Sequence, residues 1–134
     1  MGIEPARFAK MTKAYTDAWN SGDPEAVASF FAPGKGITIN RGANQFGRPA
    51  MVAMAKGFMT SFADLKLTCD FFRVAADHAV YGWTLEGHHS ETGNHVKASG
   101  WEEWELDDAC RITNSLGWFD AADYDRQVAG ENGA

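Results

Sequence analysis

A change of hydrophobic period near Leu65 constrains the fold of this chain more than any other feature of its sequence. Before it, apolar residues recur every three to four positions, as on one face of an α-helix. From there to about Asp120 they alternate with polar residues, which predicts strands at 65–74, 79–89, 95–106 and 111–119. The connections are too short for parallel crossovers, so we expect antiparallel neighbours. Helices followed by such a sheet predict an α+β fold, with the helices packed on one face of a curved sheet.

A turn within residues 15–24 separates the first two predicted helices. The helix before it has one apolar face that must be buried, formed by Phe8, Met11, Tyr15, Ala18 and Trp19. Gly22 can take the positive φ of a helix end, Asp23 is a typical N-cap, and Pro24 suits a first helical position. Further helices are predicted at 24–32 and about 49–62, with a short strand at 36–40 and a loop at 41–47.

Composition limits the possible functions. With 134 residues and 45% hydrophobic content, we expect a single domain over 1–134, ordered at about 5–125, with a frayed tail at 130–134. The net charge of −6 and the scattered basic residues disfavour nucleic-acid and anionic-membrane partners. Without an apolar run near ~18 residues or a signal-peptide start, we expect a soluble, cytoplasmic protein. Cys69 and Cys110 lack metal or redox spacing and are expected to be buried thiols.

Strand alternation predicts which side chains face the helices. Along 95–106 the inward set is Ala98, Gly100, Glu102, Trp104 and Leu106. Along 79–89 it is Tyr81, Trp83, Leu85, Gly87 and His89. Along 111–119 one face holds Ile112, Asn114, Leu116 and Trp118, which leaves Ser115 and Gly117 on the other. Trp101 is predicted outward, where a large exposed indole favours a protein–protein contact.

Glu102 is the most informative candidate site residue. Alternation sends its carboxyl into an otherwise apolar face, where burial would raise its pKa and let it act as a donor or general acid. A β-bulge could instead turn it outward beside Glu103 and Glu105. His89 is expected near a pocket mouth as a base or donor, or else solvated beside the following turn with His88. No inward carboxylate lies at ligand spacing from these histidines, so no metal site is expected.

Several segments, in this order and spacing, resemble a known superfamily. They are Trp19-Asn-Ser-Gly-Asp-Pro-Glu-Ala-Val-Ala-Ser-Phe-Phe-Ala-Pro33, Phe62-Ala-Asp-Leu65, Trp83-Thr-Leu-Glu-Gly-His-His89 with Thr92-Gly93, Arg111-Ile112, and Trp118-Phe-Asp120. With them the chain resembles the nuclear transport factor 2-like superfamily, and within it the SnoaL-like branch, which includes polyketide cyclases and shares a fold with ketosteroid isomerase. The resemblance implies a cone in which a bent, mostly antiparallel sheet wraps three helices around a deep apolar pocket. It also implies a homodimer through the outer sheet face, consistent with the outward Trp101.

The resemblance also suggests roles for individual residues. Tyr15 matches the ketosteroid isomerase tyrosine that donates to the substrate oxygen, and Glu102 matches its acidic partner; alternatively, Tyr15 packs its ring and bonds a backbone carbonyl. The catalytic candidates are Tyr15, Glu102 and His89, and ligand contacts are predicted at Trp19, Asn40, Phe58, Trp83, Trp104, Asn114 and Trp118. The chain departs from the family where Ile39 or Asn40 stands in place of the aspartate base. It departs again where Ser115 and Gly117 replace a histidine and an aspartate.

Three functions from different classes remain open. The first is an isomerase or cyclase without cofactor, acting on an apolar carbonyl or polycyclic compound; Tyr15 and Glu102 would polarise the carbonyl and His89 would move the proton. The second is a non-catalytic ligand-binding module with the same pocket, which the missing aspartate at Asn40 favours. The third is a dimeric interaction module with a filled cone and a large apolar sheet face around Trp101.

Overall fold

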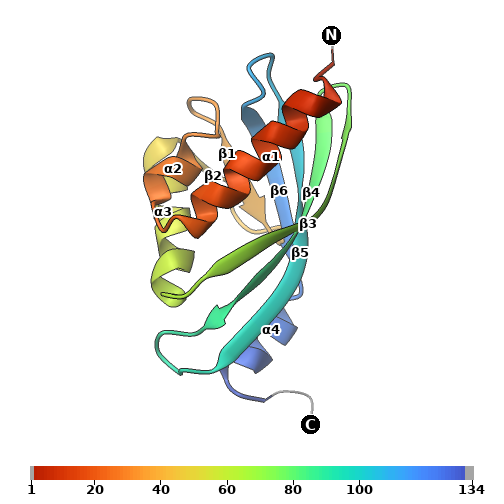
Figure 1. Ribbon diagram of the computed structural model, residues 1–134. Helices are drawn as coiled ribbons and strands as arrows, with labels where there is room; N and C mark the ends of the chain where they lie inside the picture. The colour runs from red at the N-terminus through yellow and green to blue at the C-terminus, as the bar shows by residue number, and fades with distance from the viewer. Residues whose placement is uncertain (1, 132–134) are drawn as a thin grey trace.

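The computed structural model describes residues 2–131, in which three helices cover one face of a curved six-stranded sheet (Figure 1). These three helices are α1 (Pro5–Asn20), α2 (Pro24–Ala28) and α3 (Arg48–Ser61), and a fourth helix, α4 (Ala121–Val128), follows the last strand. The strands are β1 (Gly36–Ile39), β2 (Gln45–Phe46), β3 (Lys66–Ala75), β4 (His78–His88), β5 (His95–Leu106) and β6 (Ile112–Phe119). Their order is β2-β1-β6-β5-β4-β3, and all pairs are antiparallel except β1 with β6. The predicted α+β class is confirmed.

The corner between α1 and α2 follows the predicted turn chemistry. Gly22 has a φ of +76°, which residues with a side chain rarely adopt. The Asp23 side chain accepts a hydrogen bond from the Glu25 N–H and so caps α2. All five predicted apolar positions of α1 are buried. α2 is shorter than predicted because Phe31 pairs with Ile112 in a parallel bridge, which draws the chain out of the helix toward β6.

A bulge at the start of β6 decides which of its side chains face the helices. Two successive residues of β5 pair with Ile112 and Asn114, so Thr113 is an extra residue on β6. Alternation counted from Ile112 therefore fails beyond this point. Ser115 is fully buried, and Asn114 borders a hollow on the opposite, outer face of the sheet. The prediction that Asn114 shares a face with Ile112 is wrong for this reason.

Two secondary-structure elements, β2 and α4, were not predicted from the sequence. The two-residue strand β2 lies within the expected loop at 41–47, and it is too short to leave a periodic pattern. The helix α4 follows β6, and the Asp120 side chain caps it by accepting a hydrogen bond from the Asp123 N–H. The backbone N–H groups of Gly130 and Glu131 close the end of α4 on helix carbonyls. The rest of the predicted frayed tail, 132–134, lies outside the described residues.

The core beneath α1 is a cluster of aromatic side chains. Trp104 stacks on Tyr81 with ring centroids 5.1 Å apart, and it meets Tyr15 and Phe8 edge-on at 5.0 and 6.1 Å. All four side chains are buried. Because these rings come from α1, β4 and β5, their packing sets where α1 lies over the sheet.

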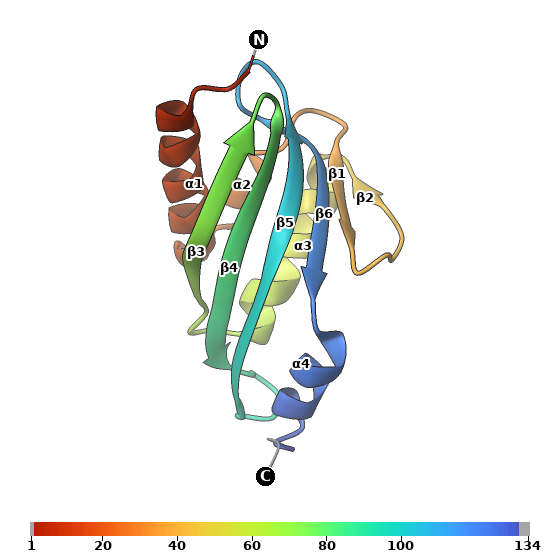
Figure 2. The ribbon, with the colours of Figure 1, turned by 90° about the vertical axis from the view of Figure 1, so that its right-hand side faces the viewer.

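Further predictions concern the two cysteines, the absence of a membrane-spanning segment and the outer face of the sheet. Both cysteines are free thiols; Cys110 is buried as predicted, whereas Cys69 is only half-buried. Within residues 2–131 no helix is long and apolar enough to cross a membrane. Figure 2 shows that α1, α2 and α3 leave the outer face of β3, β4 and β5 uncovered. Trp101 lies on that face, as predicted, and is exposed.

Candidate functional site

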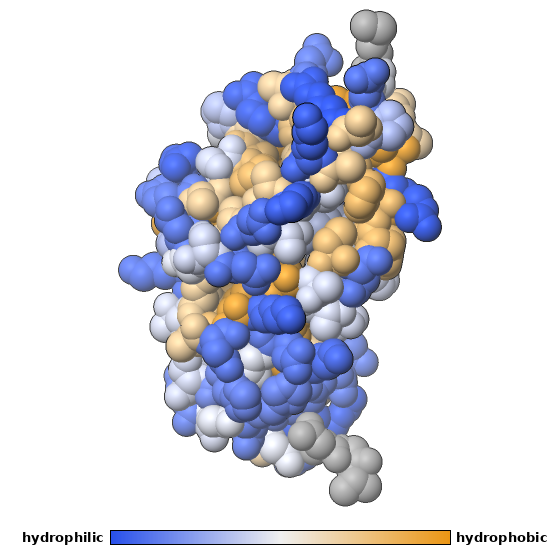
Figure 3. Space-filling view, in the orientation of Figure 1, coloured by the Kyte–Doolittle hydropathy of each residue, from blue (hydrophilic) through white to orange (hydrophobic). Residues whose placement is uncertain are grey.

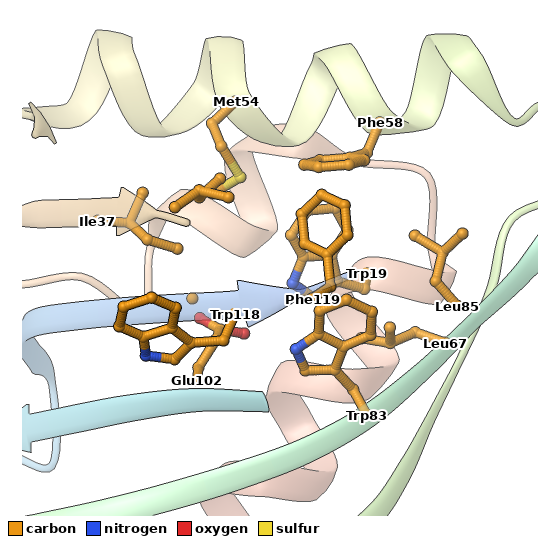
Figure 4. A pocket seen from close by; sticks show the side chains of 12 residues that line it. Trp19, Ile37, Met54, Phe58, Leu67, Trp83, Leu85, Glu102, Trp118 and Phe119 are labelled. Carbon is orange, nitrogen blue, oxygen red and sulfur yellow. The ribbon is translucent and has the colours of Figure 1, made fainter. Parts of the chain in front are cut away.

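A small cavity lies between the end of α1, the middle of α3 and the inner face of the sheet (Figure 4). It encloses about 60 Å³, whereas one water molecule needs roughly 10–15 Å³. The lining is apolar apart from one carboxyl group, and it consists of Trp19, Ile37, Ile39, Met54, Phe58, Leu67, Trp83, Leu85, Glu102, Gly117, Trp118 and Phe119. The cavity therefore has room for a small, mostly apolar ligand.

Glu102 supplies the carboxyl group of this cavity. The residue is 7% exposed, because strict alternation along β5 turns it toward the helices. Its Oε1 accepts hydrogen bonds from the Trp104 indole and the Ser115 hydroxyl, each at 3.1 Å. The Tyr15 hydroxyl lies 3.1 Å from both carboxylate oxygens. The predicted inward orientation is confirmed, and the alternative, in which a bulge turns Glu102 outward, does not apply.

Burial raises the pKa of the Glu102 carboxyl above its usual value. Desolvation is the largest cause, and the donors Trp104, Ser115 and Tyr15 offset part of it. No Lys, Arg or His within residues 2–131 forms an ion pair with this carboxyl. The same part of the chain also holds no group of three side chains that could bind a metal ion. A carboxyl in these surroundings takes up and releases its proton closer to neutral pH, as acid–base catalysis requires.

Tyr15 lies behind Glu102 and does not line the cavity. Burial, followed by the negative charge of Glu102, raises the pKa of the phenol well above its usual value. Tyr15 therefore stays protonated and donates to the carboxylate. The structure brings Tyr15 and Glu102 together, as the resemblance implied, but Tyr15 is placed to orient the carboxyl group and has no access to a ligand.

Trp19, one of the residues that line the cavity, carries an unpartnered polar atom. Its indole packs edge-on against Phe58, with ring centroids 6.0 Å apart. The Nε1 atom is buried and, among the residues that the structure describes, has no hydrogen-bond acceptor. Nearly all buried N–H groups in proteins have one.

Phe58, Trp83 and Trp118 also line the cavity, as predicted. Trp118 stands at its edge, since it pairs with the outward Trp101 and donates its indole N–H to Glu103 at 2.6 Å. Trp104 does not line the cavity. It is buried in the aromatic core and contacts Glu102 from behind.

Three predicted site residues lie away from the cavity. Asn40 has a φ of +49° in the turn after β1, where its side chain accepts a hydrogen bond from the Phe119 backbone N–H. Asn114 is turned to the outer face by the bulge in β6. His89 follows the end of β4, and its ring packs against Phe62. Alternation predicted the side to which His89 points, but not how far along the strand the cavity extends.

Several lining or contacting residues were missed from the sequence. They are Ser115, which donates to Glu102, and the apolar wall residues Ile37, Ile39, Met54, Leu67, Leu85, Gly117 and Phe119. For two of these residues, Ser115 and Gly117, the sequence did contain evidence of a place in the site. The resemblance places polar family residues at the positions of Ser115 and Gly117, and Gly117 pairs directly with Glu102. Alternation from Ile112 instead left these two positions unassigned to the pocket.

The curved sheet, with helices on its inner face and an apolar cavity between them, defines the fold class. A family model described as a SnoaL-like domain matches residues 12–115, and the chain belongs to this family. It is thereby a member of the nuclear transport factor 2-like superfamily.

Solved structures share this fold. A candidate SnoaL-like polyketide cyclase from Jannaschia sp. CCS1 superposes with a TM-score of 0.83 at 13% identity, over 96% of this chain and 97% of that chain. AclR, a candidate hydroxylase from Streptomyces galilaeus, gives 0.80 at 17%, over 96% and 87%. A hypothetical protein with a ketosteroid isomerase-like fold from Catenulispora acidiphila, solved with trimethylamine, gives 0.81 at 16%, over 90% and 92%. At these identities the likeness shows the fold alone. A search of curated proteins found no significant match.

Proposed function

We propose that this protein is a cofactor-independent enzyme of the isomerase or cyclase type, which moves a proton within a small apolar carbonyl compound. Glu102 is the acid–base group. The observation that supports this best is a buried carboxyl, with its pKa raised by burial, in the wall of an apolar cavity. A raised pKa makes the carboxylate a stronger base, and the dry surroundings strengthen its interactions with the reacting atoms.

The reaction begins with Glu102 ionised. Its carboxylate takes a proton from the carbon next to the carbonyl group. The electron pair of that C–H bond forms the C=C bond of an enolate, and the carbonyl π electrons move to oxygen. Return of the proton from Glu102 to a different carbon of an unsaturated ketone gives an isomer, with no net change in charge or oxidation state. Tyr15, Ser115 and Trp104 hold the carboxyl group in place for both transfers.

The size of the cavity favours a ligand with a short chain. About 60 Å³ is available. A ring needs more room, since the apolar cavity that binds benzene in another protein measures about 150 Å³. Displacement of a wall residue such as Phe58 or Phe119 would have to provide that room for a cyclic compound. Small apolar ketones are therefore the first compounds to test.

The test measures exchange of α-protons for deuterium, which reports proton removal whatever the final product is. The protein is incubated in D₂O with a panel of cyclic and short-chain ketones, and the α-proton signals are followed by ¹H NMR. We expect the wild type to accelerate exchange and Glu102→Gln to lose the acceleration, because glutamine keeps the shape but cannot take the proton. Glu105→Gln, on the exposed face of β5, is the matched control. Equal rates for wild type and Glu102→Gln would contradict the proposal.

A non-catalytic ligand-binding protein is the second candidate. Among the described residues that line the cavity, Glu102 is the only ionisable one. The aromatic side chains around this carboxyl also suit a small organic cation, and the structural relative from Catenulispora acidiphila was solved with trimethylamine. Calorimetry with choline and its uncharged isostere 3,3-dimethylbutan-1-ol tests this function. Preference for choline, without α-proton exchange on any ketone, would favour the binder.

We also propose that the protein forms a homodimer through the outer face of the sheet. Phe71 pairs with Gly82, and Gly82 pairs with Trp101, so the two aromatic residues lie in one row across β3, β4 and β5. Phe71 is 44% exposed and Trp101 43% exposed. Apolar residues also gather along the edge of the molecule formed by β3 and β4 (Figure 3). An exposed apolar row of this kind favours contact with another protein surface.

A further inference from the structure

The indole Nε1 of Trp19 is the one buried side-chain nitrogen or oxygen, among residues 2–131, that lacks a hydrogen-bond partner. Trp19 lies in the last turn of α1 and is 7% exposed. Its ring is part of the cavity wall. A buried N–H group without an acceptor is destabilising, because it has lost its water and gained no bond in return. A ligand that supplied an acceptor would offset this cost.

Other indole groups in this chain do have acceptors. Trp104 donates to Glu102 at 3.1 Å, and Trp118 donates to Glu103 at 2.6 Å. The Trp19 N–H lies near enough to the Tyr15 hydroxyl to lower the pKa of that phenol, against the larger raising effects of burial and of Glu102. However, it forms no hydrogen bond with the hydroxyl, whose own hydrogen is directed to Glu102.

Figure 4 shows the nitrogen-bearing edge of the Trp19 indole and the carboxyl group of Glu102 on the same side of the cavity. We propose that the Trp19 N–H binds the oxygen atom of the ligand, so that a carbonyl group lies between this donor and the Glu102 carboxylate. This inference rests on the proposed function, in which Glu102 takes the proton. It narrows the substrate class to uncharged ketones or aldehydes with one acceptor oxygen on a small apolar body.

The assigned role of Trp19 is electrostatic. When Glu102 removes the α-proton, negative charge develops on the carbonyl oxygen, and a fixed N–H donor in a dry cavity stabilises it. The proton goes to Glu102, and Trp19 keeps its own, since an indole N–H only donates. The base is thus held by β5 and the donor by α1. Glu102 is the single ionisable group in the cavity wall among the residues that the structure describes, so an uncharged donor has to stabilise the negative charge on the ligand.

The direct experiment is NMR of the ¹⁵N-labelled indole groups in the whole protein. The chain has 5 tryptophans, and Trp19→Phe identifies the Trp19 signal. Butan-2-one is compared with 2-methylbut-1-ene, which has nearly the same shape and no oxygen. We expect butan-2-one to move the Trp19 N–H signal downfield, and the hydrocarbon, which offers no acceptor, to leave it near its position in the free protein. An unchanged signal at saturation with butan-2-one, the same shift with both compounds, or no binding of butan-2-one would overturn the inference.

A ligand-free control tests the competing acceptor. If Tyr15 accepts from Trp19 in solution, Tyr15→Phe will move the Trp19 N–H signal upfield in the free protein, and the inference fails. If the indole is free, the signal of the variant stays close to that of the wild type. Where Trp19→Phe folds poorly, the Trp19 signal is assigned by elimination, with each of the other four tryptophans replaced in turn by phenylalanine. Both measurements then observe Trp19 itself in the folded protein.

Deuterium exchange separates this inference from the proposed function. Trp19→Phe is expected to lower the exchange rate by about 10²–10³-fold, as removal of an oxyanion donor does. The pH profile is expected to keep its shape, because Glu102 is untouched. If Trp19→Phe exchanges at the wild-type rate and Glu102→Gln does not, the Trp19 assignment fails and the proposed function stands. If Glu102→Gln exchanges at the wild-type rate, the proposed function fails.

Discussion

The hydroxyl group of Tyr15 lies 3.1 Å from each carboxylate oxygen of Glu102, across 87 positions of the sequence. Two separate patterns produce this contact: the helical period puts Tyr15 on the buried face of α1, and alternation puts Glu102 on the inner face of β5. The contact therefore couples the ionisation of Glu102 to the packing of α1 on the sheet.

Tyr15→Phe is expected to raise the pKa of Glu102 further and to destabilise the fold. The ring keeps its packing against Tyr81 and Trp104, but the carboxyl loses a donor that favours its ionised form. The midpoint of the pH profile for α-proton exchange therefore moves to higher pH. The free energy of unfolding is expected to fall by about 1–3 kcal/mol. Urea unfolding and ¹³C NMR titration of the carboxyl group measure the two effects.

Tyr81→Phe is the matched control for this prediction. Tyr81 is equally buried and stacks on Trp104, but its hydroxyl pairs with Thr16 and does not touch Glu102. The variant is expected to lose stability while the pKa of Glu102 stays at its wild-type value. An equal pKa shift in both variants would mean that general loosening of the core, and not the lost hydrogen bond, changes the ionisation of Glu102.

Glu102 is expected to make the protein less stable as pH rises. Its pKa is raised above 4.5 in the folded state, so the folded protein holds this proton more tightly than the unfolded chain. Its contribution is fully present below the unfolded pKa and is lost as pH rises through the folded pKa. Glu102→Gln cannot ionise, so its stability is expected to vary less over this window. Thermal unfolding from about pH 4 to 8 measures the difference, and identical slopes for the two proteins would rule out this effect.

Gly117→Ala is expected to weaken ligand binding without destabilising the fold. Gly117 lines the cavity beside Glu102. An added Cβ would lie 3.5 Å from the nearest Ile37 atom and 3.6 Å from the nearest Ile39 atom, which is ordinary contact. The methyl group therefore takes up ligand space, and we expect about a tenfold loss of ketone affinity by calorimetry.

Gly57→Ala serves as the control for the added methyl group. Gly57 is exposed in α3, and its Cβ would meet nothing within 4 Å. This variant is expected to gain up to about 1 kcal/mol of stability from helix propensity, with unchanged ketone affinity. If Gly117→Ala binds ketones as tightly as this control, the cavity beside Glu102 is not the binding site.

Trp101→Glu is expected to convert a homodimer into a monomer. The substitution places a charge in the exposed row that Trp101 forms with Phe71, and an unpaired charge in an interface core opposes association. Light scattering after size-exclusion chromatography measures the mass. Phe46→Glu is the control, since Phe46 is 65% exposed but belongs to the short strand β2 at the other edge of the sheet. A wild-type protein that is monomeric at high concentration would contradict the dimer.

Glu102 and Ser115 show how far the sequence predicts the site. Glu102 was placed correctly because β5 alternates without interruption along its whole length. Ser115 was missed because one extra residue at the start of β6 reverses the alternation after Ile112. The sequence of β6 does not predict that bulge, because the bulge depends on how β6 pairs with β5.

By itself, the sequence determined the α+β class, the buried face of α1 and the inward carboxyl of Glu102. These features rest on local periodicity, turn chemistry and capping, which act over a few neighbouring residues. Only the tertiary structure decided that Tyr15 stands behind Glu102, that Ser115 donates to it, that the Trp19 N–H lacks an acceptor, and that Asn40, His89 and Asn114 lie elsewhere. These relationships depend on strand register and on packing between distant segments, which no local pattern contains.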